Sequence, residues 1–337
     1  MKVSMEKNSS KNNGTGRISN LLRKNEVVSV TLAVLLLVFL IIARPNFLDR
    51  VNIDSLQTSI APYGIMAIGM MVLLISGVFD LSVGSTMGLG GLVSAISLTM
   101  GASPLAAILA GILSGLLVGL INGVVVEIAG VNALITTIGT MYIGRGISEI
   151  VLVGRGYAGY TNFPEEFNNF GRGQLFNVYY MFWILIILVV VFQLVLRYTK
   201  FGRQLYFIGG NYDAAEKLGI NNRRIRILSF VLSGVLAAFA GILVTARAGI
   251  ANRYTGVGAH MDVIIACIIG GGSLIGGQGS IIGAFSGMVF MVLMSNAFNL
   301  YAIPPQWQSI LVGFILLVVI TVDGYVSLNK QKRLGKI

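Results

Sequence analysis

The chain has 337 residues, of which 55% are hydrophobic and 11% are charged, and its mean hydropathy is +0.83. This composition is typical of integral membrane proteins, because a soluble protein would leave too much of this apolar surface in water. The apolar residues form long continuous runs, which excludes a transmembrane β-barrel with its alternating segments of about 10 residues. The net charge of +11 comes largely from basic residues beside these runs, so it is a topology signal and we expect no nucleic-acid binding.

Ten apolar runs approach the length that a helix needs to cross a bilayer, about 20 residues. In chain order they are 27–43, 60–77, 84–100, 104–129, 133–153, 178–196, 227–246, 261–275, 281–297 and 310–322. Small residues within them, such as Gly111, Gly115 and Gly119, let helix backbones approach closely. We therefore predict an all-α integral membrane protein, a polytopic helical bundle of about 10 spans (range about 8 to 10) with some broken or re-entrant helices. The runs 133–153, with Arg145 and Glu149, and 261–275 are also compatible with re-entrant segments.

Basic residues are concentrated in three segments. Residues 1–26, 197–226 and the chain from 323 onward hold 17 of the 24 Lys and Arg residues. Basic segments beside membrane spans face the cytoplasm, and even numbers of predicted spans separate these three, as a common side requires. We predict cytoplasmic N- and C-termini, a flexible cytoplasmic tail 1–26, a membrane domain 27–323 with a cytoplasmic loop 197–226, and a cytoplasmic tail 324–337.

The sequence lacks the motifs of the common membrane-bound enzymes. It has no G-x-x-x-x-G-K-[ST] string for nucleotide phosphates, no H-E-x-x-H, no G-x-S-x-G and a single cysteine. The glycine cluster GGGSLIGGQGS (270–280) has no Lys after its glycines, so we interpret it as a tight turn or a break between helices. We expect no catalytic residue, no metal site and no cofactor in this chain, which is therefore not an enzyme.

A few ionisable residues fall in or near the apolar runs, where they are expensive. Asp80 is the most informative, because SGVFDLSVGS (76–85) places a Gly before it and Ser82 two residues after it. Such a string ends one helix and caps the next, while a direct substrate or ion contact is the alternative. Glycine interruptions of this kind recur in 76–95 and 270–290, one in each half of the chain, which suggests structural repeats around a transport site.

Four strings together resemble one protein family. GVFDLSVGS (77–85), GLINGVVV (119–126), FIGGNYDAAEKLGINNRRIRI (207–227) and the glycine-rich segment 258–300 are similar to the permease subunits of bacterial ABC importers for ribose and other simple sugars. The similarity keeps the same order from about residue 46 to 323. It implies a multi-pass permease in the cytoplasmic membrane, in contact with lipids and with a second copy or a homologous permease. It also implies a cytoplasmic ATP-binding subunit that holds ATP and Mg, and an extracellular or periplasmic sugar-binding protein.

The loop 197–226 contains the signature that couples such permeases to their ATPase. The signature has the form [DE]-A-A-x-x-x-G, and the resemblance assigns to the coupling loop Gly210, Asn211, Asp213, Ala214, Ala215 and Gly219. Small alanines let a short helix seat closely in a groove of the ATPase, Asp213 favours the N-terminal turn, and Gly219 can end the helix. A solvated basic loop is the alternative. Arg223, Arg224 and Arg226 follow as membrane-surface anchors or contacts to an acidic partner protein.

A sugar path through the membrane needs amides and hydroxyls that face the bundle interior. Our candidates for the path or for helix breaks are Asp80, Ser82, Asn122, Asn296 and Asn299. Each asparagine is equally compatible with a hydrogen bond between helices. The favoured function is a monosaccharide permease of an ABC importer. The alternatives are an importer permease for a branched-chain amino acid, nucleoside or autoinducer sugar, an ion-coupled secondary transporter, and a structural scaffold.

Overall fold

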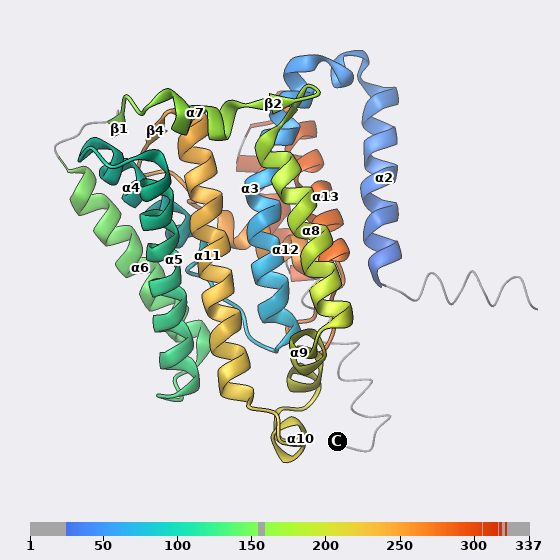
Figure 1. The fold of residues 1–337 in the computed structure, drawn as a ribbon. Coiled ribbons are helices and arrows are strands. Elements are labelled where there is room, and N and C mark those ends of the chain that lie inside the picture. The colour runs from blue at the N-terminus through green and yellow to red at the C-terminus, as the bar shows by residue number, and fades with distance from the viewer. Residues whose placement is uncertain (1–24, 154–158, 305, 316, 319–320, 322–337) are drawn as a thin grey trace, which may run out of the picture.

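The described part of the chain is a bundle of long helices. The structure is a computed structural model, which describes residues 25–153, 159–304, 306–315, 317–318 and 321. In Figure 1, α9 and α10 lie at one end of the bundle, and α7 lies with the strands at the opposite end. We call these the α10 end and the α7 end. Of the predicted tails, 1–24 and 324–337 lie outside the described residues.

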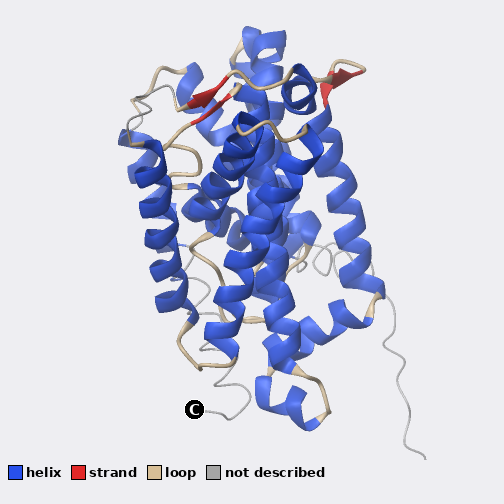
Figure 2. Cartoon of the chain, turned by 60° about the vertical axis from the view of Figure 1, so that its left-hand side comes forward, coloured by secondary structure: helices blue, strands red, loops and turns tan. Residues whose placement is uncertain are grey.

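Helices make up nearly all of the regular structure. They are α2 (Asn25–Ala43), η1 (Pro45–Leu48), α3 (Arg50–Ile75), α4 (Val83–Thr99), α5 (Pro104–Glu127), α6 (Ala133–Leu152), α7 (Glu165–Arg172), α8 (Tyr180–Tyr198), α9 (Lys200–Gly210), α10 (Tyr212–Lys217), α11 (Asn222–Ala248), α12 (Ala259–Ile269) and α13 (Ile281–Leu300). Two short antiparallel pairs join β1 (Tyr160–Thr161) to β4 (Ile250–Ala251) and β2 (Gln174–Leu175) to β3 (Val178–Tyr179). Figure 2 shows both pairs confined to one end of the bundle. The predicted all-α class is confirmed.

The predicted spans coincide with helices. Within the described residues, five helices are long and apolar enough to cross a membrane by length and composition: α3, α5, α8, α11 and α13. Shorter apolar helices are Val27–Ala43 within α2, α4 and α12. The first nine predicted runs each overlap one helix, and the tenth overlaps helical residues 306–315. The number of spans stays a prediction.

Helix α3 begins well before the apolar run that predicted it. The run starts at residue 60, whereas the helix starts at Arg50. Its first turns are polar: Arg50 Nε forms an ion pair with Asp54 Oδ1 at 3.0 Å, and Thr58 Oγ1 donates to the Asp54 carbonyl at 2.8 Å. A hydropathy pattern detects only the apolar part of such a helix, so the predicted run 60–77 begins later than the helix.

Glycines allow α5 to pack directly on its neighbours. A Cβ added at Gly115 would collide with the carbonyl oxygen of Gly234 on α11, and one at Gly119 would collide with that of Phe230. At Gly111 the obstacle is the Ser94 hydroxyl of α4. The prediction of close backbone approach along this row is confirmed, and it places α11 at the centre of the bundle beside α5 and α4.

Two interruptions break the helices, and they meet. Residues 76–82 separate α3 from α4, and residues 270–280 separate α12 from α13. The Gly277 N–H donates to the Ile75 carbonyl oxygen at 2.8 Å, and a Cβ on Gly276 would lie 2.7 Å from the Gly77 Cα. The prediction of a break at 270–280 is confirmed.

The helix before the second interruption is short. Helix α12 has 11 residues, or about 16 Å at 1.5 Å per residue, half of the roughly 30 Å hydrocarbon core. Its N-terminus meets that of α4, because a Cβ on Gly84 would lie 2.5 Å from the Gly256 carbonyl oxygen. The run 261–275 is therefore a half-length helix followed by a loop, whereas α6 is continuous across run 133–153.

Candidate functional site

The predicted loop 197–226 contains two short helices, α9 and α10, at the α10 end of the bundle (Figure 1), and its two ends belong to α8 and α11. Side-chain oxygens start both: Thr199 Oγ1 accepts from the Gly202 N–H at 3.2 Å, and Asn211 Oδ1 accepts from the Ala214 N–H at 2.9 Å. Asp213 lies in the first turn of α10, where its charge is favourable. Asn211 is thus the N-cap that separates α9 from α10.

Helix α10 ends at a glycine in the left-handed conformation. Gly219 has a φ of +79°, and its N–H donates to the Glu216 carbonyl at 2.9 Å. The next residue, Ile220, donates to the Ala215 carbonyl at 3.1 Å. This is a helix C-terminus that glycine adopts without the steric cost of a Cβ. The predicted short helix with its end at Gly219 is confirmed as local structure.

The signature residues differ in exposure. Asp213, Ala214 and Gly219 are exposed, and Leu218 between them is 71% exposed. Ala215 is only 1% exposed, so it packs inside its own chain. Of the two alanines, Ala214 is therefore the one available to a partner protein. The predicted coupling residues did not include the exposed Leu218, although its position directly before a helix-ending glycine can be recognised in the sequence.

Gly209, next to the predicted Gly210, makes a close contact with the backbone of the bundle. A Cβ on Gly209 would collide with the Ile75 carbonyl oxygen and the Gly277 nitrogen, whereas a Cβ on Gly210 would meet nothing within 4 Å. The end of α9 thus packs backbone to backbone on both helix interruptions. The sequence offered no signal to separate Gly209 from Gly210.

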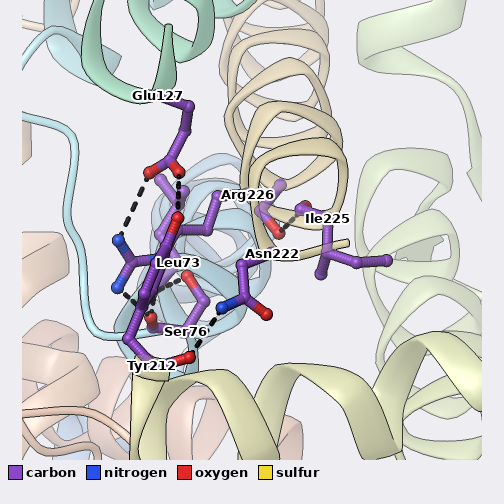
Figure 3. A network of polar contacts seen from close by, with 8 residues as sticks. Leu73, Ser76, Glu127, Tyr212, Asn222, Ile225 and Arg226 are labelled. Atoms are coloured by element: carbon purple, nitrogen blue, oxygen red, sulfur yellow. Dashed lines mark hydrogen bonds and ion pairs between the residues drawn. The ribbon is translucent and has the colours of Figure 1, made fainter. Parts of the chain in front are cut away.

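Arg226 turns into the bundle instead of facing the membrane surface. Its Nη1 pairs with Glu127 Oε1 of α5 at 3.3 Å, and its Nε and Nη2 donate to the Ser76 carbonyl at 3.1 and 2.8 Å (Figure 3). The interpretation of Arg226 as a surface anchor or a contact to a partner protein was wrong, since its acidic partner belongs to the same chain. Arg223 and Arg224 are exposed.

Tyr212 joins α10 to this ion pair. Its hydroxyl donates to Glu127 Oε2 at 3.3 Å, and the centre of its ring lies 4.7 Å from Arg226 Cζ. Asn222 Nδ2 donates to the Tyr212 carbonyl at 2.7 Å. Burial, and then the Glu127 carboxylate, raise the pKa of Tyr212 above its ordinary value, so the phenol keeps the proton that it donates.

Asp80, Ser82 and Asn122 form one buried cluster at the first interruption. Asp80 Oδ1 accepts from the Ser82 N–H at 2.7 Å and from its hydroxyl at 2.6 Å. Asn122 Nδ2 of α5 donates to Ser82 Oγ at 2.9 Å. All three residues are at most 1% exposed. These bonds stabilise the turn before α4 and connect it to α5.

The other two candidates line a cavity of about 650 Å³ between α3, α12, α13 and helical residues 306–313. Its polar lining consists of Ser55, Ser59, Tyr63, Asp262, Ser295, Asn296, Asn299, Gln308 and Ser309, and its apolar lining is rich in methionine. Asn296 Nδ2 donates to Asn52 Oδ1 at 2.6 Å, while its buried Oδ1 has no hydrogen-bond partner within the described residues. Asp80, Ser82 and Asn122 do not line this cavity.

The predicted residues thus occupy three places: the α10 end, the first interruption and the cavity. Residues 52–320 match the family described as "Branched-chain amino acid transport system / permease component". The chain belongs to this permease family. The permease is therefore a multi-pass membrane protein, the membrane component of a transport system with no catalytic role of its own.

Similar curated proteins are also permeases. The L-arabinose transport system permease protein AraH of Escherichia coli is 38% identical over 86% of this permease and 86% of its own length. The autoinducer 2 import system permease protein LsrC of Escherichia coli is 35% identical over 94% and 92%. The ribose import permease protein RbsC of Haemophilus influenzae is 33% identical over 97% and 100%. No solved structure matches the permease.

Proposed function

We propose that this permease forms the path for a monosaccharide in an ATP-driven importer, and that the cavity is the part of the path contributed by one permease chain. Its volume of about 650 Å³ lies within the range of about 300–1,000 Å³ typical of small-molecule sites. Its lining combines hydroxyls and amides with apolar side chains. These are the partners that a neutral, polyhydroxylated solute needs.

The charge of the cavity lining favours a sugar over an amino acid. The family description names branched-chain amino acids, whereas AraH and RbsC are named for sugars. A free amino acid brings a carboxylate, which needs a cation when it leaves water. No Lys or Arg is among the described residues that line the cavity. A sugar meets this lining without an unpaired charge.

One buried atom in the cavity lacks a partner that a sugar would supply. Asn296 is 8% exposed, and its Oδ1 accepts no hydrogen bond from the described residues. An unmet acceptor in an apolar setting costs free energy, about 1–3 kcal/mol. Sugar hydroxyls are donors, and Asn299 of α13 and Asp262 of α12 in the cavity lining are further acceptors. The site therefore favours a ligand with several hydroxyl groups.

The orientation follows from the basic residues. We place the α10 end and both chain termini in the cytoplasm, with the permease domain at 27–323 and about 10 spans. The tails 1–26 and 324–337 then share the cytoplasmic side with loop 197–226, and these segments hold most of the Lys and Arg residues. The α7 end faces the outside, where an extracellular or periplasmic sugar-binding protein delivers its ligand.

The exposed side of α10 is the proposed contact with the ATPase. Gly210, Asn211, Asp213, Ala214 and Gly219 belong to this coupling segment, and Ala215 supports it from inside the chain. ATP and Mg bind to the partner subunit. A second permease copy or a homologous permease completes the path, and closure of the ATPase switches the pair between outward-open and inward-open states.

Uptake by reconstituted vesicles tests this function. The full complex of permease, ATPase subunit and binding protein is placed in proteoliposomes with ATP inside, and labelled arabinose, ribose and leucine are supplied outside. We expect ATP-dependent accumulation of a sugar and none of leucine. Accumulation of leucine alone would favour the amino-acid alternative, and sugar uptake driven by an ion gradient without ATP would overturn the importer assignment.

A further inference from the structure

A single guanidinium connects α10 to two other parts of the bundle. Arg226 pairs with Glu127 at the end of α5, donates two hydrogen bonds to the Ser76 carbonyl, and lies on the ring of Tyr212 (Figure 3). Tyr212 is the first residue of α10, and Ser76 is the first residue after α3. The cation therefore bridges the coupling helix and the first helix interruption.

The position of Ser76 matters because a hinge follows it. Gly77 has a φ of +81°, and the chain then enters the Asp80 and Ser82 turn that starts α4. Hinges are a few residues at element ends that absorb large backbone changes. A displacement of the Ser76 carbonyl therefore acts on the segment that sets the angle between α3 and α4.

The connection is stiff because its charges are buried. The Glu127 side chain is 3% exposed and that of Arg226 is 16% exposed. Separating a buried ion pair leaves an uncompensated charge, so the two groups move together. The guanidinium also satisfies Ser76 with two donors at once, a planar geometry that an ammonium does not reproduce. Arg223 and Arg224 on the same turn are exposed and make no such link within the described residues.

We propose that Arg226, held by Glu127 and Tyr212, is the positioning residue that passes the movement of α10 to the interruption between α3 and α4. The proposal rests on the proposed function, in which α10 docks on the ATPase subunit. When the ATPase displaces α10, the Tyr212 ring shifts the buried ion pair. The pair then pulls the Ser76 carbonyl, and the start of α4 changes its angle to α3.

The ratio of sugar transported to ATP hydrolysed tests this role. The full complex in proteoliposomes is compared as wild type, Arg226→Gln, and the matched exposed variants Arg223→Gln and Arg224→Gln. Coupling between sites typically amounts to about 5–150-fold. We expect Arg226→Gln to lower the ratio at least about tenfold, with unchanged co-purification of the ATPase subunit. The two control variants should keep the wild-type ratio.

Two further variants separate positioning from simple folding. Tyr212→Ala leaves the Arg226, Glu127 and Ser76 contacts in place, so the bundle still assembles, and we expect the same loss of ratio. Exchange of the charges, Glu127→Arg with Arg226→Glu, keeps an ion pair but removes the donor to Ser76, so it should not restore transport. Full coupling in Tyr212→Ala or in the exchanged pair would overturn the proposal. If the wild-type complex itself moves no sugar, the proposed function fails instead.

Discussion

The backbone N–H of Gly277 donates to the carbonyl oxygen of Ile75 at 2.8 Å, and this bond joins the two interrupted helices of the permease. Gly209 at the end of α9 packs on the same two residues, with no room for a Cβ. The coupling segment therefore rests directly on both breaks, and backbone atoms make the contact. The coupling segment thus contacts the first interruption in two ways, through the backbone at Gly209 and through the side chain of Arg226.

This junction predicts different effects for two adjacent glycines. Gly209→Ala forces a methyl group into the Ile75 and Gly277 backbone, and such overpacking costs about 1–3 kcal/mol of folding free energy. Gly210→Ala places the same methyl group in open space and is the matched control. Thermal unfolding of the purified permease in detergent should show a lower midpoint for the first variant only. Equal midpoints for both would contradict the packing at Gly209.

Local features of the coupling segment were predictable from the sequence. Asn211 caps α10 and Gly219 ends it because each residue type satisfies a backbone requirement within a few positions along the chain. The Asp80 and Ser82 turn was predictable for the same reason. Cap and turn chemistry acts at short range, so a pattern of a few letters is enough to indicate it.

Contacts between distant residues were not predictable in this way. Arg226 and Glu127 are 99 residues apart in sequence, and either was equally compatible with a position at the membrane surface. The burial of Ala215 and the collision at Gly209 likewise depend on how α9 and α10 fold back on the bundle. Hydropathy gave the apolar helices but placed the start of α3 too late, since its polar first turns carry no apolar signal.

Because Ala214 is exposed and Ala215 is buried, the two alanines of the signature can be tested separately for docking. Ala214→Arg adds a long charged side chain on the exposed face, so co-purification of the ATPase subunit should fall while the permease still folds. Ala215→Arg inserts the same side chain into the chain's own core, and we expect it to lower the yield of folded permease. Glu165→Arg at the α7 end is the control and should retain the ATPase subunit. Retention of that subunit by Ala214→Arg would argue against docking through α10.

The glycine row of α5 predicts a stability difference between two helical glycines. Gly115→Ala collides with the Gly234 carbonyl of α11, so the helices must separate, and we expect a loss of about 1–3 kcal/mol. Gly139→Ala on α6 has nothing within 4 Å, and alanine is the better helix former by up to about 1 kcal/mol. The midpoint of thermal unfolding in detergent should therefore fall for Gly115→Ala and rise for Gly139→Ala. If Gly115→Ala stabilises the permease instead, α5 and α11 are packed less closely than the contact between Gly115 and Gly234 requires.

The cavity predicts a change in sugar affinity at Asn296. Asn296→Leu removes the hydrogen bond to Asn52 and the unpartnered Oδ1, so a sugar hydroxyl loses its acceptor. Loss of one hydrogen bond to a neutral group, about 1 kcal/mol, raises the half-saturating sugar concentration roughly fivefold. Val190→Leu on the exposed side of α8 is the control, since it lies away from the cavity.

Concentration-dependent uptake by the full complex measures this effect. Because the binding protein limits delivery at low sugar, the assay uses saturating binding protein and varies the sugar alone. A fall in maximal rate with an unchanged half-saturating concentration would place Asn296 in the framework of α13 and not in the sugar path. If the maximal rate and the sugar affinity both fall and the unfolding midpoint is also lower, the bond to Asn52 serves folding. Loss of a ligand contact alone leaves the stability of the empty permease unchanged.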